Sequence, residues 1–365
     1  MGSSPIPDHV PDGPVAGPSK VGYHAERVSA YLAGESIYPV CLELDLTSAC
    51  TLSCPECPST RAPQRHSLPW ATIDRLLKVL GGRTTGLLLT GGEPTMAPLF
   101  GPALDRARVC GFKEIAVVTN GSLLDDPAVS DTLVRYATAV RLSLYGWDDA
   151  STENFKTTLG RIGRLRERIE GAGSALEIGV SALTSDRCVD RLGTIADQVR
   201  AAGAHWLYFH PLCRKWGLGH PELADQHGVL AEVARLETSS PDGFRVYALQ
   251  DRYVASPVFF EGYHAAHFLL VVGADGANYL APEVKYQPGH VIACLDNHWD
   301  EGFLWASARL QQIAAVRSAS YPAVGSRHRG ILYSHFIEAL RRGDAAAHHD
   351  LQVAAQCGFR FPHIL

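Results

Sequence analysis

A regular alternation of short apolar runs and amphipathic segments constrains the fold of this chain more than any other feature. Short apolar runs predict six strands, at Val40–Leu46, Gly86–Thr90, Glu114–Thr119, Ala139–Leu144, Leu176–Ala182 and Trp206–Pro211. Segments with helical spacing follow the first five, at Trp70–Leu80, Leu99–Cys110, Asp126–Tyr136, Asn154–Ile169 and Val189–Ala202. Strands joined through helices form parallel sheets with right-handed crossovers. Six units are too few for a closed eight-stranded barrel, so we expect an α/β fold, a partial (β/α)6 barrel.

The pattern changes after Pro211. A helix is predicted over Glu222–Leu236, and a hairpin over Phe268–Gly273 and Ala277–Leu280 through an Asp-Gly turn. Two more helices are expected, at Leu304–Arg317 and Ile331–Arg342. We therefore predict three parts: a flexible, Pro- and Gly-rich lead-in over residues 1–37, the barrel over 38–215, and a smaller α+β extension over 216–365.

Composition excludes several functional classes. The chain has 365 residues, 19% charged side chains and a net charge of −5. A mildly acidic chain does not suit a nucleic-acid partner, which needs a basic face. We expect no membrane partner either, because no apolar run reaches the length of about 20 residues that spans a bilayer. The opening residues also lack the apolar stretch of a signal peptide, which predicts a cytoplasmic protein with reduced cysteines.

Three of the nine cysteines stand together just after the first predicted strand. Cys50, Cys54 and Cys57 have the spacing C-x3-C-x2-C. Three thiolates in one loop suit a [4Fe–4S] cluster that leaves one iron open to another ligand. A structural zinc site usually needs four ligands in two pairs, and no second pair stands near this loop. A non-catalytic iron–sulfur or zinc protein remains the alternative at this point.

Polar and glycine-containing motifs end the next four strands. Gly91-Gly92-Glu93-Pro94 ends the second, and the glycines permit a close backbone approach to a ligand while Glu93 offers acceptors to an ammonium group. Thr119 and Asn120 end the third strand, and Ser143 and Ser181 lie near the ends of the fourth and fifth. The carboxyl ends of parallel strands form the functional edge of such sheets.

The cysteine triplet and the GGEP motif, in this register of a β/α pattern, resemble the radical S-adenosylmethionine (SAM) superfamily over residues 38–215. The resemblance implies that Cys50, Cys54 and Cys57 ligate a [4Fe–4S] cluster and that Gly91–Glu93 bind the amino group of SAM. It implies SAM contacts for the remaining motif residues, which are Pro94, Thr119, Asn120, Ser143 and Ser181. An electron from a flavodoxin- or ferredoxin-type reductant would then cleave SAM to a 5′-deoxyadenosyl radical. Glu56 departs from the pattern, because an aromatic residue usually precedes the third cysteine.

The extension over 216–365 resembles the SPASM/twitch extensions that hold further clusters, but without most of their cysteines. Ala281, Ala323 and Ser326 stand where those extensions carry cysteines, and only Cys294 and Cys357 remain in this part of the chain. We therefore predict one cluster and an extension that serves as a lid. This part most resembles radical SAM enzymes that modify carbohydrate or aminoglycoside antibiotics. That resemblance implies a small sugar-like or glycoside substrate and an epimerisation or dehydration.

Candidate substrate residues surround the expected barrel mouth. Cys213 follows the sixth strand, where a thiol can return a hydrogen atom to a substrate radical. Hydroxyl-rich substrates need several polar contacts, for which the candidates are Tyr145, Glu177, His210, Arg214, Lys215 and Glu283. Decarboxylation or oxidation of a nucleoside or a ribosomal peptide is the alternative chemistry. A peptide is the weaker alternative, because the roughly 37 residues before the first strand do not suggest a peptide-binding module.

Overall fold

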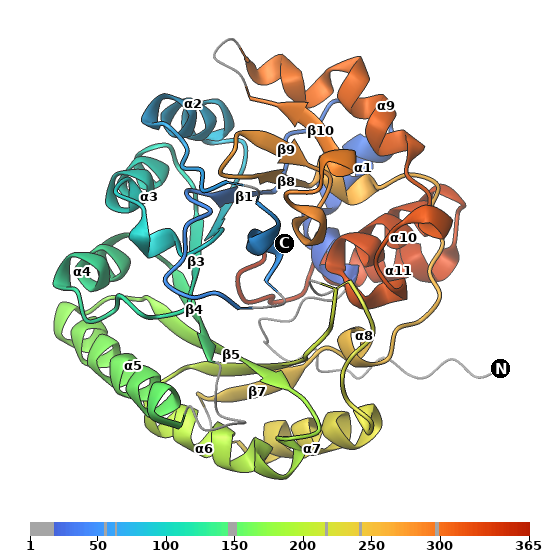
Figure 1. The fold of residues 1–365 in the computed structure, drawn as a ribbon. Helices are drawn as coiled ribbons and strands as arrows, with labels where there is room; N and C mark the ends of the chain where they lie inside the picture. The colour runs from blue at the N-terminus through green and yellow to red at the C-terminus, as the bar shows by residue number, and fades with distance from the viewer. Residues whose placement is uncertain are drawn as a thin grey trace.

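A ten-stranded sheet in the order β10-β9-β8-β1-β2-β3-β4-β5-β6-β7 forms the centre of the computed structural model (Figure 1). The structure describes residues 18–54, 57–62, 64–144, 152–215, 218–240, 243–295 and 299–365. The strands are β1 (Cys41–Asp45), β2 (Gly86–Thr90), β3 (Glu114–Thr119), β4 (Ala139–Leu144), β5 (Glu177–Thr184), β6 (Trp206–Pro211), β7 (Arg245–Ala248), β8 (Leu269–Val272), β9 (Ala277–Tyr279) and β10 (Val291–Cys294). Strands β1 to β7 pair in parallel in chain order. The fold is the α/β partial barrel that the alternation predicts.

Helices cover the outer face of the parallel strands (Figure 1). They are α2 (Trp70–Leu80), α3 (Phe100–Val109), α4 (Pro127–Tyr136), α5 (Thr152–Ala172), α6 (Leu192–Ala201) and α7 (Gln226–Ser239). Alternate strand residues, such as Leu42, Leu87 and Val140, join the buried faces of these helices in one apolar core. The other residues of each strand face the inside of the barrel, because side chains alternate along a strand.

Two features of the barrel differ from the prediction. A seventh parallel strand, β7, extends the sheet beyond the predicted six. It has only four residues, too few to show a period in the sequence. Helix α7 begins at Gln226 rather than Glu222, because the Asp225 side chain accepts a hydrogen bond from the backbone of Gly228 and caps the helix there.

The C-terminal half completes the sheet on its other edge. Strand β8 pairs in parallel with β1, and β9 and β10 continue antiparallel. The predicted hairpin is confirmed, and Gly276 supplies the positive φ of 79° that its turn requires. The helices here are α8 (Gln250–Tyr253), α9 (Ser307–Ala315), α10 (Arg329–Arg341) and α11 (Ala345–Ala354). The predicted helix over 304–317 is therefore split into a 3-10 turn and α9.

Short 3-10 turns link these elements. They are η1 (Pro18–His24), η2 (Pro58–Arg61), η3 (Pro94–Met96), η4 (Val189–Arg191), η5 (His264–His267), η6 (Pro282–Val284), η7 (Pro288–His290), η8 (Glu301–Trp305), η9 (Ser318–Ser320) and η10 (Gly325–Arg327). Among the described residues, none of the helices combines the length and the apolar composition that a membrane crossing requires.

The flexible lead-in expected over residues 1–37 is wrong from residue 18 onward. The turn η1 leads directly into α1 (Ala25–Leu32). Val21 and Val28 are fully buried in an apolar cluster that also contains side chains of α10 and α11. A Cβ on Gly22 would lie 3.0 Å from Ala354, so α11 packs closely on this segment. These residues are ordered by burial against the distant end of the chain. No local pattern in the sequence predicts that contact.

The last residues of the chain lie across the amino ends of β1, β2 and β3, near the centre of the ring of strands (Figure 1). The backbone N–H of His363 donates to Glu114 at 2.8 Å, and its carbonyl oxygen would lie 2.0 Å from a Cβ on Gly86. Lys20 Nζ donates to the Ile364 carbonyl at 2.5 Å. These contacts cover the amino edge of the barrel, the edge opposite to the predicted site.

We expect the substitution Gly179→Ala to destabilise the protein. A Cβ on Gly179 would lie 1.9 Å from the ring of Trp206, so the ring or strand β5 must move, at a cost of about 1–3 kcal/mol. Gly171 in α5 is the matched control, because nothing lies within 4 Å of its Cβ position and alanine there adds about 0.5–1 kcal/mol of helix stability. Urea unfolding measures both. An unchanged midpoint for Gly179→Ala would contradict the packing.

Candidate active site

The three motif cysteines lie in the loop after β1 and are half-buried. Burial raises the pKa of Cys50 and of Cys54, and the nearby Cys57 thiol raises both further. Cys50 Sγ accepts hydrogen bonds from the Leu52 N–H at 3.4 Å and from Asn120 Nδ2 at 3.5 Å. Within the described residues, no three His, Cys, Asp or Glu side chains converge on a single-ion site. A cubane is wider than one ion, so three spaced thiols with N–H donors fit it.

Backbone contacts attach this loop to the end of β2. The N–H of Gly92 donates to the Thr47 carbonyl at 2.9 Å, and the N–H of Glu93 donates to the Ala49 carbonyl at 2.8 Å. A Cβ on Gly92 would lie 2.1 Å from the Ala49 carbonyl oxygen, and Gly91 has a positive φ of 115°. The close approach that these glycines permit is therefore made to the backbone of the cysteine loop.

The Glu93 carboxylate joins the end of β2 to the end of β3. Its side chain is fully buried, just before Pro94 opens the turn η3. Its Oε1 atom accepts from the backbone and hydroxyl of Thr95, at 3.1 and 2.6 Å, and from the Thr119 hydroxyl at 2.7 Å. Its Oε2 atom accepts from the Asn120 N–H at 2.8 Å. With one such contact, Oε2 retains capacity to accept from an ammonium group.

Asn120 links this carboxylate to the cysteine loop. Its Nδ2 donates to Thr51 Oγ1 at 2.9 Å as well as to Cys50, and its Oδ1 accepts from the backbone N–H of Ser122 at 2.9 Å. The loop after β1, the GGEP motif and the end of β3 thus form one hydrogen-bonded unit. The three motifs that the sequence predicts to act as one site are therefore neighbours in the structure.

Ser143 and Ser181 lie in register on adjacent strands and face the barrel interior. Ser181 is buried and donates to the Leu142 carbonyl at 3.4 Å. The same register continues to Tyr208 on β6 and Tyr247 on β7. The candidate Tyr145 lies outside the described residues.

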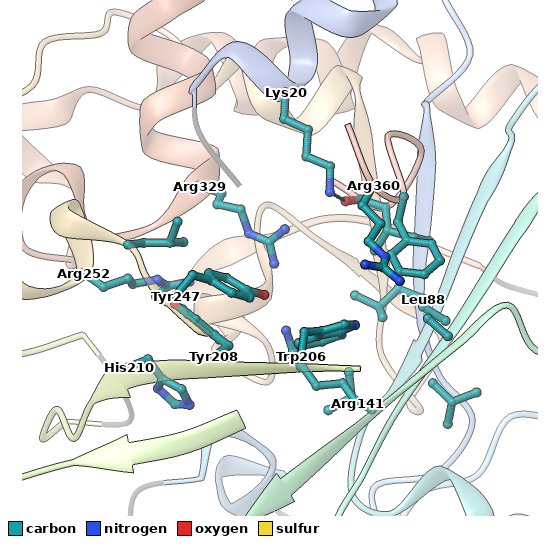
Figure 2. Close-up of a pocket in the computed structure, with 17 residues that line it drawn as sticks. Lys20, Leu88, Arg141, Trp206, Tyr208, His210, Tyr247, Arg252, Arg329 and Arg360 are labelled. Atoms are coloured by element: carbon teal, nitrogen blue, oxygen red, sulfur yellow. Dashed lines mark hydrogen bonds between the residues drawn. The ribbon is translucent and has the colours of Figure 1, made fainter. Parts of the chain in front are cut away.

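A cavity of about 220 Å³ occupies the barrel interior, and Tyr208 and Tyr247 of this layer line it (Figure 2). Its wall contains side chains from the inner faces of β2, β3, β4, β6 and β7, with others from η1, α8, α10 and the chain end. The polar and aromatic members are Lys20, Arg141, Trp206, Tyr208, His210, Tyr247, Arg252, Arg329 and Arg360.

Comparison with known proteins identifies the family. A profile described as the Radical SAM superfamily matches residues 44–197, the span that contains the cysteine loop, Glu93 and Asn120. Residues 44–197 are therefore a radical SAM domain. The cofactors of this domain are accordingly a [4Fe–4S] cluster and SAM, and the donors described above fit both.

Two curated relatives match part of the chain. A GTP 3′,8-cyclase of Synechococcus sp. (strain CC9902) is 38% identical over 119 residues, which are 30% of this chain and 33% of that protein. A probable GTP 3′,8-cyclase of Sulfolobus acidocaldarius is 28% identical over 214 residues, 53% of this chain and 64% of that one. The chain thus spans less than two thirds of either relative.

The fold is also found among solved structures. Streptococcus suis SuiB bound to its precursor peptide SuiA matches with a TM-score of 0.59 and 13% identity, over 93% of this chain and 81% of that one. SuiB bound to SAM matches with a TM-score of 0.56 and 15% identity, over 72% and 65% of the two chains. At these identities the similarity shows the radical SAM fold alone.

The predicted substrate residues do not lie together in the structure. His210 lines the cavity, and burial lowers its pKa to about 3, which keeps the imidazole neutral. Glu283 is buried outside the cavity wall and accepts from the hydroxyls of Tyr263 and Tyr321, at 3.1 and 2.9 Å. Arg214 is mostly exposed and forms an ion pair with Glu222, while Lys215 adopts a positive φ of 54° in the same turn.

Glu177 does not lie at the mouth where the sequence places it. It is the first residue of β5, at the amino edge of the sheet, and forms an ion pair of 2.5 Å with Arg360. The predicted strand, Leu176–Ala182, already places Glu177 near its amino end, so its position along the strand argues against the mouth. Glu177 therefore supports the chain end rather than the mouth.

Cys213 lies two residues after the carboxyl end of β6 and is not among the described residues that line the cavity. Its Sγ contacts Arg327 Nη1 at 3.4 Å and the Pro211 carbonyl at 3.6 Å. Burial raises the pKa of Cys213, although the guanidinium groups of Arg327 and Arg252 oppose the rise. The side chain is thus a neutral thiol with its hydrogen atom in place at neutral pH.

Sequence reasoning missed a buried charge cluster under the cysteine loop. Lys285 Nζ donates to Glu43 at 2.9 Å and to Asp45 at 2.7 Å, and Tyr286 donates to Asp45 at 2.7 Å. Glu43 and Asp45 alternate on an otherwise apolar predicted strand, which was the available signal. Lys285 thus bonds to the strand that leads into the cysteine loop.

The positions where related extensions carry cysteines have other roles here. Ser326 donates to Asp251 at 2.7 Å and accepts from the Ser256 N–H at 2.9 Å, and Ala281 is packed in the core. Cys294 is exposed and Cys357 is half-buried.

We expect anaerobically prepared protein to contain about four iron atoms per chain, the content of one [4Fe–4S] cluster. The prediction follows from the residues at positions 281, 323 and 326, which supply no thiolate. Iron and acid-labile sulfide analysis measures it. A content near eight irons would contradict it.

We expect Glu93→Gln to lower both stability and iron retention. In either orientation, the NH₂ group of the glutamine amide faces existing donors: the Asn120 N–H, or those of Thr119 and Thr95. Loss of these charge-assisted hydrogen bonds costs about 2–3 kcal/mol of stability. Thermal unfolding and iron content report the two effects. Glu232→Gln, in an exposed pair with Arg235, is the control and shifts stability by less than about 0.5 kcal/mol. Equal behaviour of the two variants would refute the role of Glu93.

Proposed function

We propose that this radical SAM enzyme abstracts a hydrogen atom from a small sugar-like or glycoside substrate inside the barrel, and that epimerisation or dehydration follows. The observation that carries the proposal is the shared layer of Ser143, Ser181 and Tyr208. The two serines stand where the family places SAM contacts, and Tyr208 belongs to the cavity wall. A substrate in the cavity therefore lies next to the positions expected to hold SAM.

Different motif residues bind the cluster and SAM. The thiolates of Cys50, Cys54 and Cys57 ligate the cluster, and the N–H groups at Cys50 Sγ stabilise its negative charge. Glu93 Oε2 accepts from the amino group of SAM. When bound, the cluster and SAM supply a 5′-deoxyadenosyl radical, with the electron delivered by a flavodoxin- or ferredoxin-type reductant.

Cys213 serves as the hydrogen donor in an epimerisation. After a hydrogen atom leaves one face of a substrate carbon, the Cys213 S–H bond breaks homolytically and a new C–H bond forms on the other face. The sulfur is left as a thiyl radical, which one electron from the external reductant and one proton from solvent return to the thiol. Burial favours this role, because it keeps the sulfur protonated beforehand.

A nucleotide is the second candidate substrate. The two curated relatives are named GTP 3′,8-cyclase and probable GTP 3′,8-cyclase, and the cavity wall offers aromatic rings on which a base can stack.

We expect the cluster-loaded protein to convert SAM to 5′-deoxyadenosine and methionine when dithionite is added, and Cys50→Ala to abolish the conversion. Loss of one of three cluster ligands leaves the open-iron cubane unsupported. Chromatography of the reaction measures both products. Absence of 5′-deoxyadenosine from protein with a full complement of iron would refute the proposed activity.

We expect Cys213→Ala to end the incorporation of solvent deuterium into the product. A thiol exchanges its hydrogen with D₂O, so an epimerised product formed through Cys213 gains one deuterium. The variant should still form 5′-deoxyadenosine, because Cys213 lies apart from the cysteine loop. Mass spectrometry of the product and of 5′-deoxyadenosine separates the steps. Unchanged deuterium content through several turnovers would reject Cys213 as the donor.

A further inference from the structure

The barrel cavity has an unusual charge. Five cationic side chains line it, those of Lys20, Arg141, Arg252, Arg329 and Arg360. None of the described residues in its wall is an aspartate or a glutamate. Like charges gathered in a low-dielectric interior repel strongly, so such a wall needs anions from elsewhere.

The carboxylates behind the wall provide only part of that charge. Glu177 pairs with Arg360 at 2.5 Å. Lys20 donates to a neutral carbonyl, that of Ile364. Burial and the nearby Arg329 guanidinium lower the pKa of Lys20 to about 7, although Glu114 opposes the effect. Among the described residues, no carboxylate forms an ion pair with Arg252 or Arg329, whereas Arg360 is paired with Glu177.

Two buried donors at the cavity also lack an acceptor. Trp206 is only 5% exposed, and its Nε1 has no hydrogen-bond partner among the described residues. The same holds for Arg252 Nε, although Arg252 Nη1 contacts His328 Nδ1 at 3.3 Å. Buried donors without acceptors cost free energy, and a ligand that brings oxygen atoms relieves the cost.

Flat aromatic surfaces stand beside these cations. The rings of Tyr208 and Tyr247 stack at 5.0 Å and 18°, and Trp206 lies 6.1 Å from Tyr247. Figure 2 shows the Arg329 guanidinium reaching toward the Tyr247 and Trp206 rings from the side opposite the strands. Ring faces of this kind pack against the C–H face of a sugar or against a planar base.

We propose that this cavity binds an oxyanion of the substrate, a carboxylate or phosphate carried on a sugar-sized group, with Arg329 and Arg252 donating to the oxyanion while the ring packs on Trp206 and Tyr247. The assignment rests on the proposed function, because it takes the cavity to be the substrate chamber. It narrows the substrate class to acidic or phosphorylated compounds. A neutral sugar would leave Arg329 and Arg252 without an anion.

Calorimetric titration of the cluster-loaded protein without reductant tests the proposal. The probes are glucuronate, glucose 6-phosphate, guanosine 5′-monophosphate and, as the neutral control, glucose. At least one anionic probe is expected to bind about tenfold or more tightly than glucose. The identity of the probe that binds most tightly shows whether the site prefers a sugar acid, a sugar phosphate or a nucleotide. If none of the three binds more tightly than glucose, the proposal is wrong.

Variants locate the binding. Arg329→Gln and Arg252→Gln should each weaken the best anionic probe about tenfold or more, and Arg329→Lys should restore part of the loss. Arg235→Gln, an exposed arginine paired with Glu232, should leave binding unchanged. Thermal unfolding confirms that each variant is folded, and two arginines are used so that one unstable variant does not decide the result. Full affinity in folded Arg329→Gln and Arg252→Gln would overturn the site.

The binding result is independent of the proposed activity. Protein that forms 5′-deoxyadenosine but shows no preference for anionic probes refutes only the oxyanion site. Protein that binds an anion through Arg329 but forms no 5′-deoxyadenosine refutes only the activity.

Discussion

The backbone contact between Gly92 and the cysteine loop is the constraint on which the rest of the site depends. The Gly92 N–H donates to Thr47, and the space that a side chain would need is occupied by the Ala49 carbonyl. The protein's own backbone contacts therefore fix the loop to the end of a central strand. Glu93, the next residue, extends the attachment to the end of β3 through the Asn120 N–H. A loop without regular structure of its own thus inherits the rigidity of two strands.

The C-terminal half supports the same loop from the other side. Arg61, four residues after Cys57, donates to the Glu283 carbonyl at 2.8 Å. Lys285, two residues further, holds Glu43 and Asp45 on the strand that enters the loop. Burial alone would lower the pKa of Lys285, but these two carboxylates outweigh it and raise the pKa, so the amine stays charged. Removal of either partner would leave a buried charge without compensation, so the extension is integral to the site.

Local patterns predicted the parallel strands well, because each is a short apolar run between turn residues. Strands β3 and β4 have the predicted bounds, and the three motifs meet because parallel strands share one edge. The sequence could not show the cavity wall, since Lys20, Arg329 and Arg360 come from segments far apart in the chain. Nor did it show that Gly179 makes room for the Trp206 ring, because that depends on which faces of β5 and β6 turn inward. Pairings between strand neighbours were predictable, and contacts of the two chain ends were not.

The charges inside the barrel are separated, and the separation bears on what it can hold. Glu43 and Asp45 of β1 share the single ammonium of Lys285, while the arginines of the cavity wall come from β4, α8, α10 and the chain end. Tyr247 in the same wall supplies no negative charge, because burial raises its pKa and keeps its phenol neutral. Glu43 does act on Arg329 from a distance, yet it is already bound to Lys285. A ligand bound as proposed would therefore turn its negative end toward Arg329 and Arg252, a preference that side-chain volume alone would not create.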